Sequence, residues 1–257
     1  MSVSVSVSVS VTAFTAFAAV LRSESLKIRS ARSLGLTLAL VFAVTAGFSV
    51  LMSTSLGPEE QAAPDFDPLE SAYFGLNFGQ VAAVCFGALA VAGEYRGGAL
   101  RVSLTAVPRR GRFYAAKLAA VAVPSFAVGL VTGAVCFLAG QPLTAGGGMG
   151  PGDPGAVRAM VGCGLYLTLI TLLAAGLATL LRGATAVLGL LIPLLMIVPF
   201  VIRGEGLIEY LPDRAGRQIL FQDPVGSLGP WTGLAVLALW TAASVWAGWE
   251  ALRRRDA

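Results

Sequence analysis

Apolar residues occur in runs of about 20, and the short segments between these runs hold most of the charged residues. A helix of this length crosses the hydrocarbon core of a bilayer, which is about 30 Å thick. The runs contain charged residues only near their ends, at Lys117, Arg158 and Glu250. We therefore predict an all-α integral membrane protein whose transmembrane domain covers residues 34–257. Its six expected spans are residues 34–56, 71–93, 114–138, 157–181, 184–202 and 231–252.

The segment before the first span divides into two parts. Residues 1–11 alternate serine and valine, and because an isolated strand is unstable we expect a disordered tail of low complexity. Residues 12–33 repeat apolar side chains at helical spacing, which predicts an amphipathic helix at the membrane interface. A solvated cytoplasmic helix is the alternative. The charged positions that define this helix are Arg22, Glu24, Lys27 and Arg29.

The composition supports a membrane environment. Hydrophobic residues make up 56% of the chain and charged residues only 12%, whereas soluble domains carry about 25% charged residues. Cys85, Cys136 and Cys163 lie inside apolar runs, where cysteine usually acts as a small buried hydrophobic residue. Their spacing matches neither a metal site nor a disulfide framework.

The distribution of basic residues predicts the orientation. Fourteen of the 18 Lys and Arg residues lie on the side that holds both termini. Loops rich in Lys and Arg stay in the cytoplasm, so we expect a multi-pass protein of the cell membrane with both termini cytoplasmic. An even number of spans agrees with this. The same asymmetry accounts for the net charge of +4, so no nucleic-acid partner is expected.

The chain lacks the common catalytic motifs. It has no phosphate-binding loop, and without histidine it has neither an HExxH zinc site nor a Ser-His-Asp triad. The span centres hold no ionisable residue, which argues against an intramembrane enzyme. Tyr73, Asn77 and Gln80 are the polar positions of the second span. They either line a pathway or hydrogen-bond neighbouring helices, and the second reading is favoured.

The segment from residue 93 to 117 is longer than a simple connection and strongly basic. Residues 99–104 are expected to form a short surface helix, with Leu100 and Leu104 on one face and Pro108 ending it. Such a helix between basic flanks serves either as a docking element for a partner or as a cytoplasmic loop that binds anionic lipid. Physical arguments alone leave the two readings even.

The external segment, residues 203–230, mixes large apolar residues with charges. It forms either an amphipathic external helix, a re-entrant hairpin or an ordinary interfacial loop. The pattern does not separate these alternatives.

Two short stretches resemble a known family. Gly93-Glu94-Tyr95-Arg96-Gly97-Gly98-Ala99-Leu100, followed by Pro108-Arg109-Arg110 and Ala116-Lys117, looks like the permease subunit of bacterial type-2 ABC exporters. The opening Arg22-Ser23-Glu24 with Lys27 and Arg29 also resembles theirs. Six spans with both termini inside match the family's layout over most of the chain. Ala99 departs from the pattern, because the family often has threonine there.

The resemblance implies an export permease for drugs, lipids, polysaccharides or peptides. Its partners would be separate ABC ATPase subunits, which hold ATP and magnesium, and a second permease half that makes a homo- or heterodimer in the lipid bilayer. The permease itself would bind no cofactor or metal and would not be an enzyme. A non-transporting membrane anchor or immunity-type protein is the alternative. The residues expected to couple to the ATPase are Glu94, Tyr95, Arg96, Gly97, Leu100, Arg101, Pro108, Arg109, Arg110 and Lys117.

Overall fold

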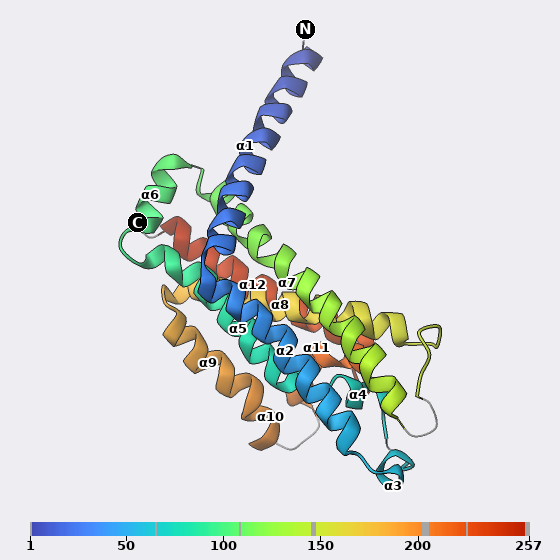
Figure 1. Ribbon diagram of the computed structural model, residues 1–257. Coiled ribbons are helices and arrows are strands. Elements are labelled where there is room, and N and C mark those ends of the chain that lie inside the picture. Colours follow the sequence, from blue (N-terminus) through green and yellow to red (C-terminus); the bar gives the residue numbers. More distant parts are fainter. Residues whose placement is uncertain are drawn as a thin grey trace.

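The computed structural model shows a helical bundle with no strand among the residues that it describes (Figure 1). These residues are 2–64, 66–107, 109–144, 148–201, 206–224 and 226–254. The long helices lie side by side along one axis, and short helices cover the two ends of the bundle (Figure 1). The all-α prediction is therefore confirmed for the described part of the chain.

In the part of the chain that the structure describes, five helices are long and apolar enough to cross a membrane. They are α2 (Arg32–Ser55), α5 (Leu76–Ala92) continued by the 3-10 turn η1 (Gly93–Tyr95), α7 (Arg110–Gly140) continued by η2 (Gln141–Leu143), α8 (Ala156–Leu181) and α12 (Pro230–Arg254). Each coincides with one predicted span. The prediction of a span over 184–202 corresponds to α9 (Ala184–Met196), followed by α10 (Val198–Val201). Because α9 has 13 residues, it is about 20 Å long and too short to cross the core alone.

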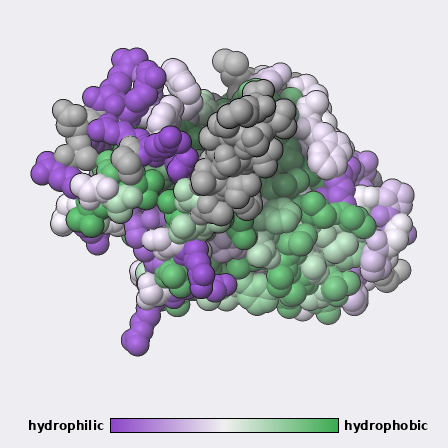
Figure 2. Space-filling model, turned by 90° about the horizontal axis from the view of Figure 1, so that it is seen from above, coloured by the Kyte–Doolittle hydropathy of each residue, from purple (hydrophilic) through white to green (hydrophobic). Residues whose placement is uncertain are grey.

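The helices differ in how much of their surface the bundle covers. In the most apolar stretch of each helix, 67% of the residues of α8 and 61% of those of α5 are buried, against 22% in α2 and 33% in α12. Large apolar side chains on the outer helices are exposed, for example Leu40 and Phe48 on α2 and Leu239 and Trp246 on α12. Figure 2 shows a broad apolar surface with hydrophilic residues gathered on both sides of it. This surface suits a protein embedded in lipid.

The N-terminal helix α1 (Ser2–Ser30) projects beyond the bundle (Figure 1). Ala31 has extended backbone angles, φ −83° and ψ 101°, and separates α1 from α2. The structure continues α1 through residues 2–11, where the sequence pattern predicts a disordered tail. Extending an existing helix is far easier than nucleating one, so the helix that starts in the amphipathic segment continues through the serines and valines.

The external segment folds back into the end of the bundle. It contains η3 (Leu207–Tyr210), α11 (Pro212–Arg217) and η4 (Gln218–Leu220), which pack against α8 and α12. Asp213, Ile219 and Leu220 are buried. The structure thus favours the hairpin among the three alternatives. Two further short helices, α3 (Pro58–Gln61) and α4 (Pro68–Ala72), lie at the same end (Figure 1).

Close contact between α5 and α8 depends on Gly87. A Cβ atom at this position would lie 2.2 Å from the carbonyl oxygen of Thr171 on α8, far inside van der Waals contact. Small residues allow the backbones of membrane helices to approach in this way. The two most buried helices of the bundle therefore meet through a position that tolerates no side chain.

We expect Gly87→Ala to destabilise the fold by about 1–3 kcal/mol, because α5 and α8 must separate to admit the methyl group. The measurement is chemical unfolding of the full chain in detergent. Gly47→Ala is the matched control, because a Cβ at Gly47 on α2 meets no atom within 4 Å. Equal stability of the two variants would contradict the assigned contact.

Candidate functional site

Four charged side chains meet where α1, α5 and α7 converge. Lys117 Nζ on α7 donates hydrogen bonds to Glu24 Oε2 on α1, at 2.6 Å, and to Glu94 Oε1 in η1, at 2.7 Å. Lys27 Nζ on α1 donates to Glu24 Oε1 at 2.7 Å and to Glu94 Oε1 at 3.1 Å. We call Glu24, Lys27, Glu94 and Lys117 the four-charge cluster. Its two ammonium groups and two carboxylates balance.

Most of this cluster is buried. The side chains of Glu24, Glu94 and Lys117 are 3%, 8% and 5% exposed, whereas that of Lys27 is 42% exposed. Removing a charge from water costs several kcal/mol unless partners compensate for the lost hydration. Each buried charge here has an oppositely charged partner within hydrogen-bonding distance, so the cluster is stable only while all three helices stay in place.

Lys27 remains protonated far above neutral pH. Burial alone would lower the pKa of Lys27, but the hydrogen bonds and negative charges of Glu24 and Glu94 outweigh it and raise this pKa above its ordinary value of 10.5. On the alkaline side, the stabilisation from Lys27 is therefore fully present up to pH 10.5. It is lost only as the pH rises through the raised value.

The short helix α6 (Ala99–Ala106) is tied to the cluster by a hydroxyl group. Ser103 Oγ donates to Glu94 Oε2 at 3.1 Å and accepts a hydrogen bond from Lys27 Nζ at 3.3 Å. Leu100 is buried against Phe113, Tyr114 and Leu252. The helix α6 is thus attached to the bundle by a polar contact through Ser103 and by an apolar contact through Leu100. The spacing of its leucines predicts the apolar contact. The helix ends at Ala106, and Pro108 lies outside the described residues.

The expected coupling residues fall into two groups. One group makes contacts inside the protein: Tyr95 donates to the carbonyl oxygen of Thr179 at 3.3 Å, and Arg110 donates to that of Leu252 at 2.9 Å, at the C-terminal end of α12. Glu94, Leu100 and Lys117 belong to it through the contacts above. The other group is exposed: Arg96, Arg101 and Arg109. Gly97 and Gly98 have positive φ angles of 60° and 76° and form the turn between η1 and α6.

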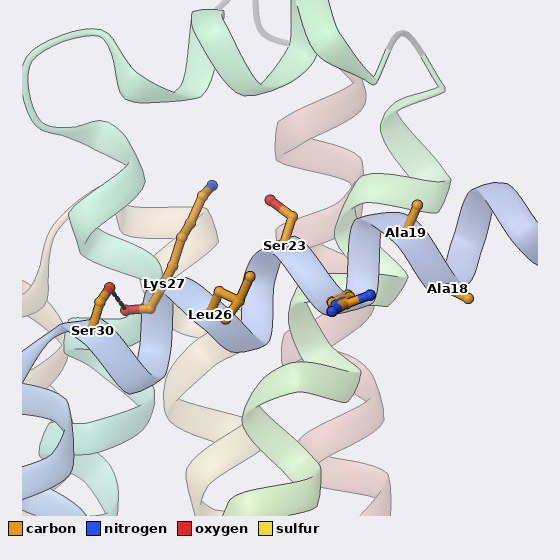
Figure 3. A pocket seen from close by; sticks show the side chains of 7 residues that line it. Ala18, Ala19, Ser23, Leu26, Lys27 and Ser30 are labelled. Atoms are coloured by element: carbon orange, nitrogen blue, oxygen red, sulfur yellow. Dashed lines mark hydrogen bonds between the residues drawn. The ribbon is translucent and has the colours of Figure 1, made fainter.

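The charged residues expected on the interfacial helix also fall into two groups. Glu24 and Lys27 belong to the four-charge cluster, whereas Arg22 and Arg29 are exposed. The hollow beside α1 in Figure 3 is lined by α1 residues only, from Ala18 to Ser30. This hollow is therefore an open face of α1 and is not an enclosed pocket.

Among the described residues, no group of three or more Cys, Asp or Glu side chains is arranged to hold a metal ion.

The polar residues of the second span all bond within the protein. Tyr73 donates to the carbonyl oxygen of Gly133 at 3.0 Å, and Asn77 Oδ1 accepts from Arg217 Nη1 at 2.6 Å. Gln80 Oε1 lies 2.6 Å from the Tyr166 hydroxyl. These contacts favour helix packing over a pathway lining for the three residues.

Sequence reasoning missed a buried carboxylate. Asp213 of α11 is 3% exposed, and its Oδ1 lies 2.7 Å from the Tyr166 hydroxyl, whose single proton Asp213 and Gln80 share. Tyr166 is the eleventh residue of α8, so this carboxylate reaches well into the bundle. The spans themselves lack ionisable residues at their centres, but the external segment supplies one. The available signal was Pro212 at the start of a short helix, which places Asp213 and Arg217 on one face.

We expect Lys117→Met to destabilise the fold by about 3–5 kcal/mol, because Glu24 and Glu94 both lose their buried cation and keep only the partly exposed Lys27 as a charged partner. Arg109→Gln, at an exposed position, should change the unfolding free energy by less than about 0.5 kcal/mol. Unfolding in detergent measures both. Lys117→Glu with Glu24→Lys restores the charge balance and should recover part of the stability that Lys117→Glu alone loses; no recovery would refute the pairing.

Comparison with known proteins assigns no family to this chain. No family model matches the chain, and no curated protein matches it significantly. The function proposed below therefore rests on the resemblance of the short motifs and on the arrangement of their residues in the structure.

Proposed function

We propose that this chain is the membrane-spanning permease subunit of an ATP-driven type-2 ABC exporter. The observation that carries the proposal is the attachment of α6 to the four-charge cluster. Ser103 bonds to Glu94, and Glu94 bonds to Lys117 of α7 and Lys27 of α1. A displacement of α6 by a partner therefore acts at once on the ends of three helices, as coupling to an ATPase requires.

The outer face of α6 supports a docking role. Val102 is 70% exposed, and Arg101 and Thr105 are exposed on the same short helix. An exposed apolar residue with polar neighbours suits a protein contact, whereas Leu100 on the opposite face holds the helix to the bundle. The sequence has no phosphate-binding loop, so ATP and magnesium belong to the ATPase partner. A second permease half would complete the translocation path.

The proposal includes six spans in the cell membrane with cytoplasmic termini. The start of α1, α6 and the end of α12 lie toward one end of the bundle in Figure 1, as an even number of crossings requires. The helices α9 and α10 together cover 184–201, about 27 Å at the rise of an α-helix, which supports a sixth crossing. The excess of Lys and Arg at the α6 end supports a cytoplasmic location for it.

Affinity capture of the intact complex should recover an ATPase subunit with a phosphate-binding loop. Val102→Glu places a charge on the docking face and should reduce this recovery at least tenfold, without lowering the stability of the permease. Val157→Glu is the control, because Val157 is similarly exposed, at 60%, at the start of α8. Capture of the intact chain without any ATPase, under conditions that preserve assemblies, would favour the membrane-anchor alternative.

Cysteine labelling tests the orientation. In a chain whose Cys85, Cys136 and Cys163 are replaced by alanine, Pro64→Cys should react with a membrane-impermeant maleimide in intact cells. Arg109→Cys should react only after the membrane is opened. The reverse pattern would overturn the proposed orientation.

A further inference from the structure

A cavity of about 250 Å³ lies beside the four-charge cluster, at the corner between α1 and α2. Ile28, Leu34 and Leu89 form apolar walls, Lys27, Arg96 and Lys117 contribute basic groups, and Glu94 contributes a carboxylate that is bonded to both lysines. The corner exists because Ala31 is extended and interrupts the helix, so the chain changes direction there. Small residues at the end of α5 leave the resulting space open.

The charge at this cavity is positive. The four-charge cluster is neutral, and the ammonium of Lys117 is bonded to both carboxylates. Arg96 also lines the cavity and is exposed, so it adds a positive charge that the cluster does not balance. The side chain of Lys27, 42% exposed, also reaches this space. The three N–H donors of the Lys27 ammonium already bond to Glu24, Glu94 and Ser103, so an anion placed here would accept hydrogen bonds from Arg96 and be attracted by the charge of Lys27.

The position of the cavity favours a lipid over a soluble anion. It lies where α2 begins and where the apolar stretch through α5 ends at Tyr95, the level at which spans leave the hydrocarbon core. Ile28 and Leu34 of its lining are buried, whereas Arg96 and Lys27 are exposed. A volume of 250 Å³ admits a phosphate with its glycerol, whereas acyl chains must remain in the bilayer.

We propose that this cavity binds the phosphate headgroup of an anionic phospholipid. The phosphodiester accepts hydrogen bonds from Arg96 near the charge of Lys27, and the glycerol lies against Ile28 and Leu34. Bound lipid bridges α1 and the η1 turn next to Glu94, and so stabilises the corner that holds the four-charge cluster. The proposal concerns a lipid site of the chain itself and does not depend on the exporter function.

The test is lipid titration of the purified full chain in detergent, with binding measured by native mass spectrometry. Phosphatidylglycerol is the probe, and phosphatidylcholine with the same acyl chains is the control lipid. Arg96→Gln should weaken phosphatidylglycerol binding about fivefold, the effect of one basic residue near a membrane surface. Ala31→Leu fills the cavity without changing a charge and should weaken binding by a similar factor. Ser33→Leu fills the same cavity from α2 if Ala31→Leu does not fold.

Arg29→Gln is the matched control, because Arg29 is exposed on α1 but does not line the cavity. It should leave phosphatidylglycerol binding unchanged. Equal weakening by Arg29→Gln and Arg96→Gln would show a diffuse basic surface and overturn the site. Unchanged binding in both filled variants, or equal affinity for phosphatidylcholine, would overturn it as well. Binding of free glycerol phosphate as tight as that of the lipid would refute the lipid assignment.

Discussion

The buried ion pairs of the four-charge cluster constrain this structure most strongly. Glu24, Glu94 and Lys117 are almost fully buried at the end of an apolar bundle, where an unpaired charge costs several kcal/mol. Both pairings of Lys117 join different helices, since Lys117 on α7 reaches Glu24 on α1 and Glu94 at the end of α5. The relative positions of α1, α5 and α7 are therefore fixed by charge compensation, and apolar contacts fill the space that this arrangement leaves.

A second polar network occupies the opposite end of α5. Gln80 meets the Tyr166 hydroxyl shared with Asp213, and Asn77 meets Arg217. One helix thus begins in a network that holds the external segment and ends in the four-charge cluster. Between the two networks, α5 packs against α8 at Gly87 with no side chain between the backbones. This makes α5 a rigid connection between the two ends of the bundle.

Local sequence patterns predicted most helices but few of the contacts between them. Hydropathy located five long helices, and the spacing of Leu100 and Leu104 located α6, because both signals depend on neighbouring residues. The pair Lys117–Glu24 joins residues 93 positions apart, and nothing local marks them as partners. Asp213 was missed for the same reason: its burial depends on a tertiary fold that returns the external segment to α8. The alternation of serine and valine in residues 2–11 does not by itself indicate a helix, whereas the structure continues α1 through them from the helix that follows.

The four-charge cluster holds three helices together with charged side chains, where apolar side chains could do the same. Well-packed apolar residues of similar volume often stabilise a fold as well as a buried ion pair does, so stability alone does not explain four charges here. A membrane anchor needs only the apolar contacts of α6. Glu94 Oε1, in contrast, accepts hydrogen bonds from both Lys27 and Lys117, and its other oxygen accepts one from Ser103. One of these bonds can break while the others keep the carboxylate compensated. A carboxylate with several partners permits small shifts of α6 without exposing an unpaired charge, which a coupling device requires and a static anchor does not.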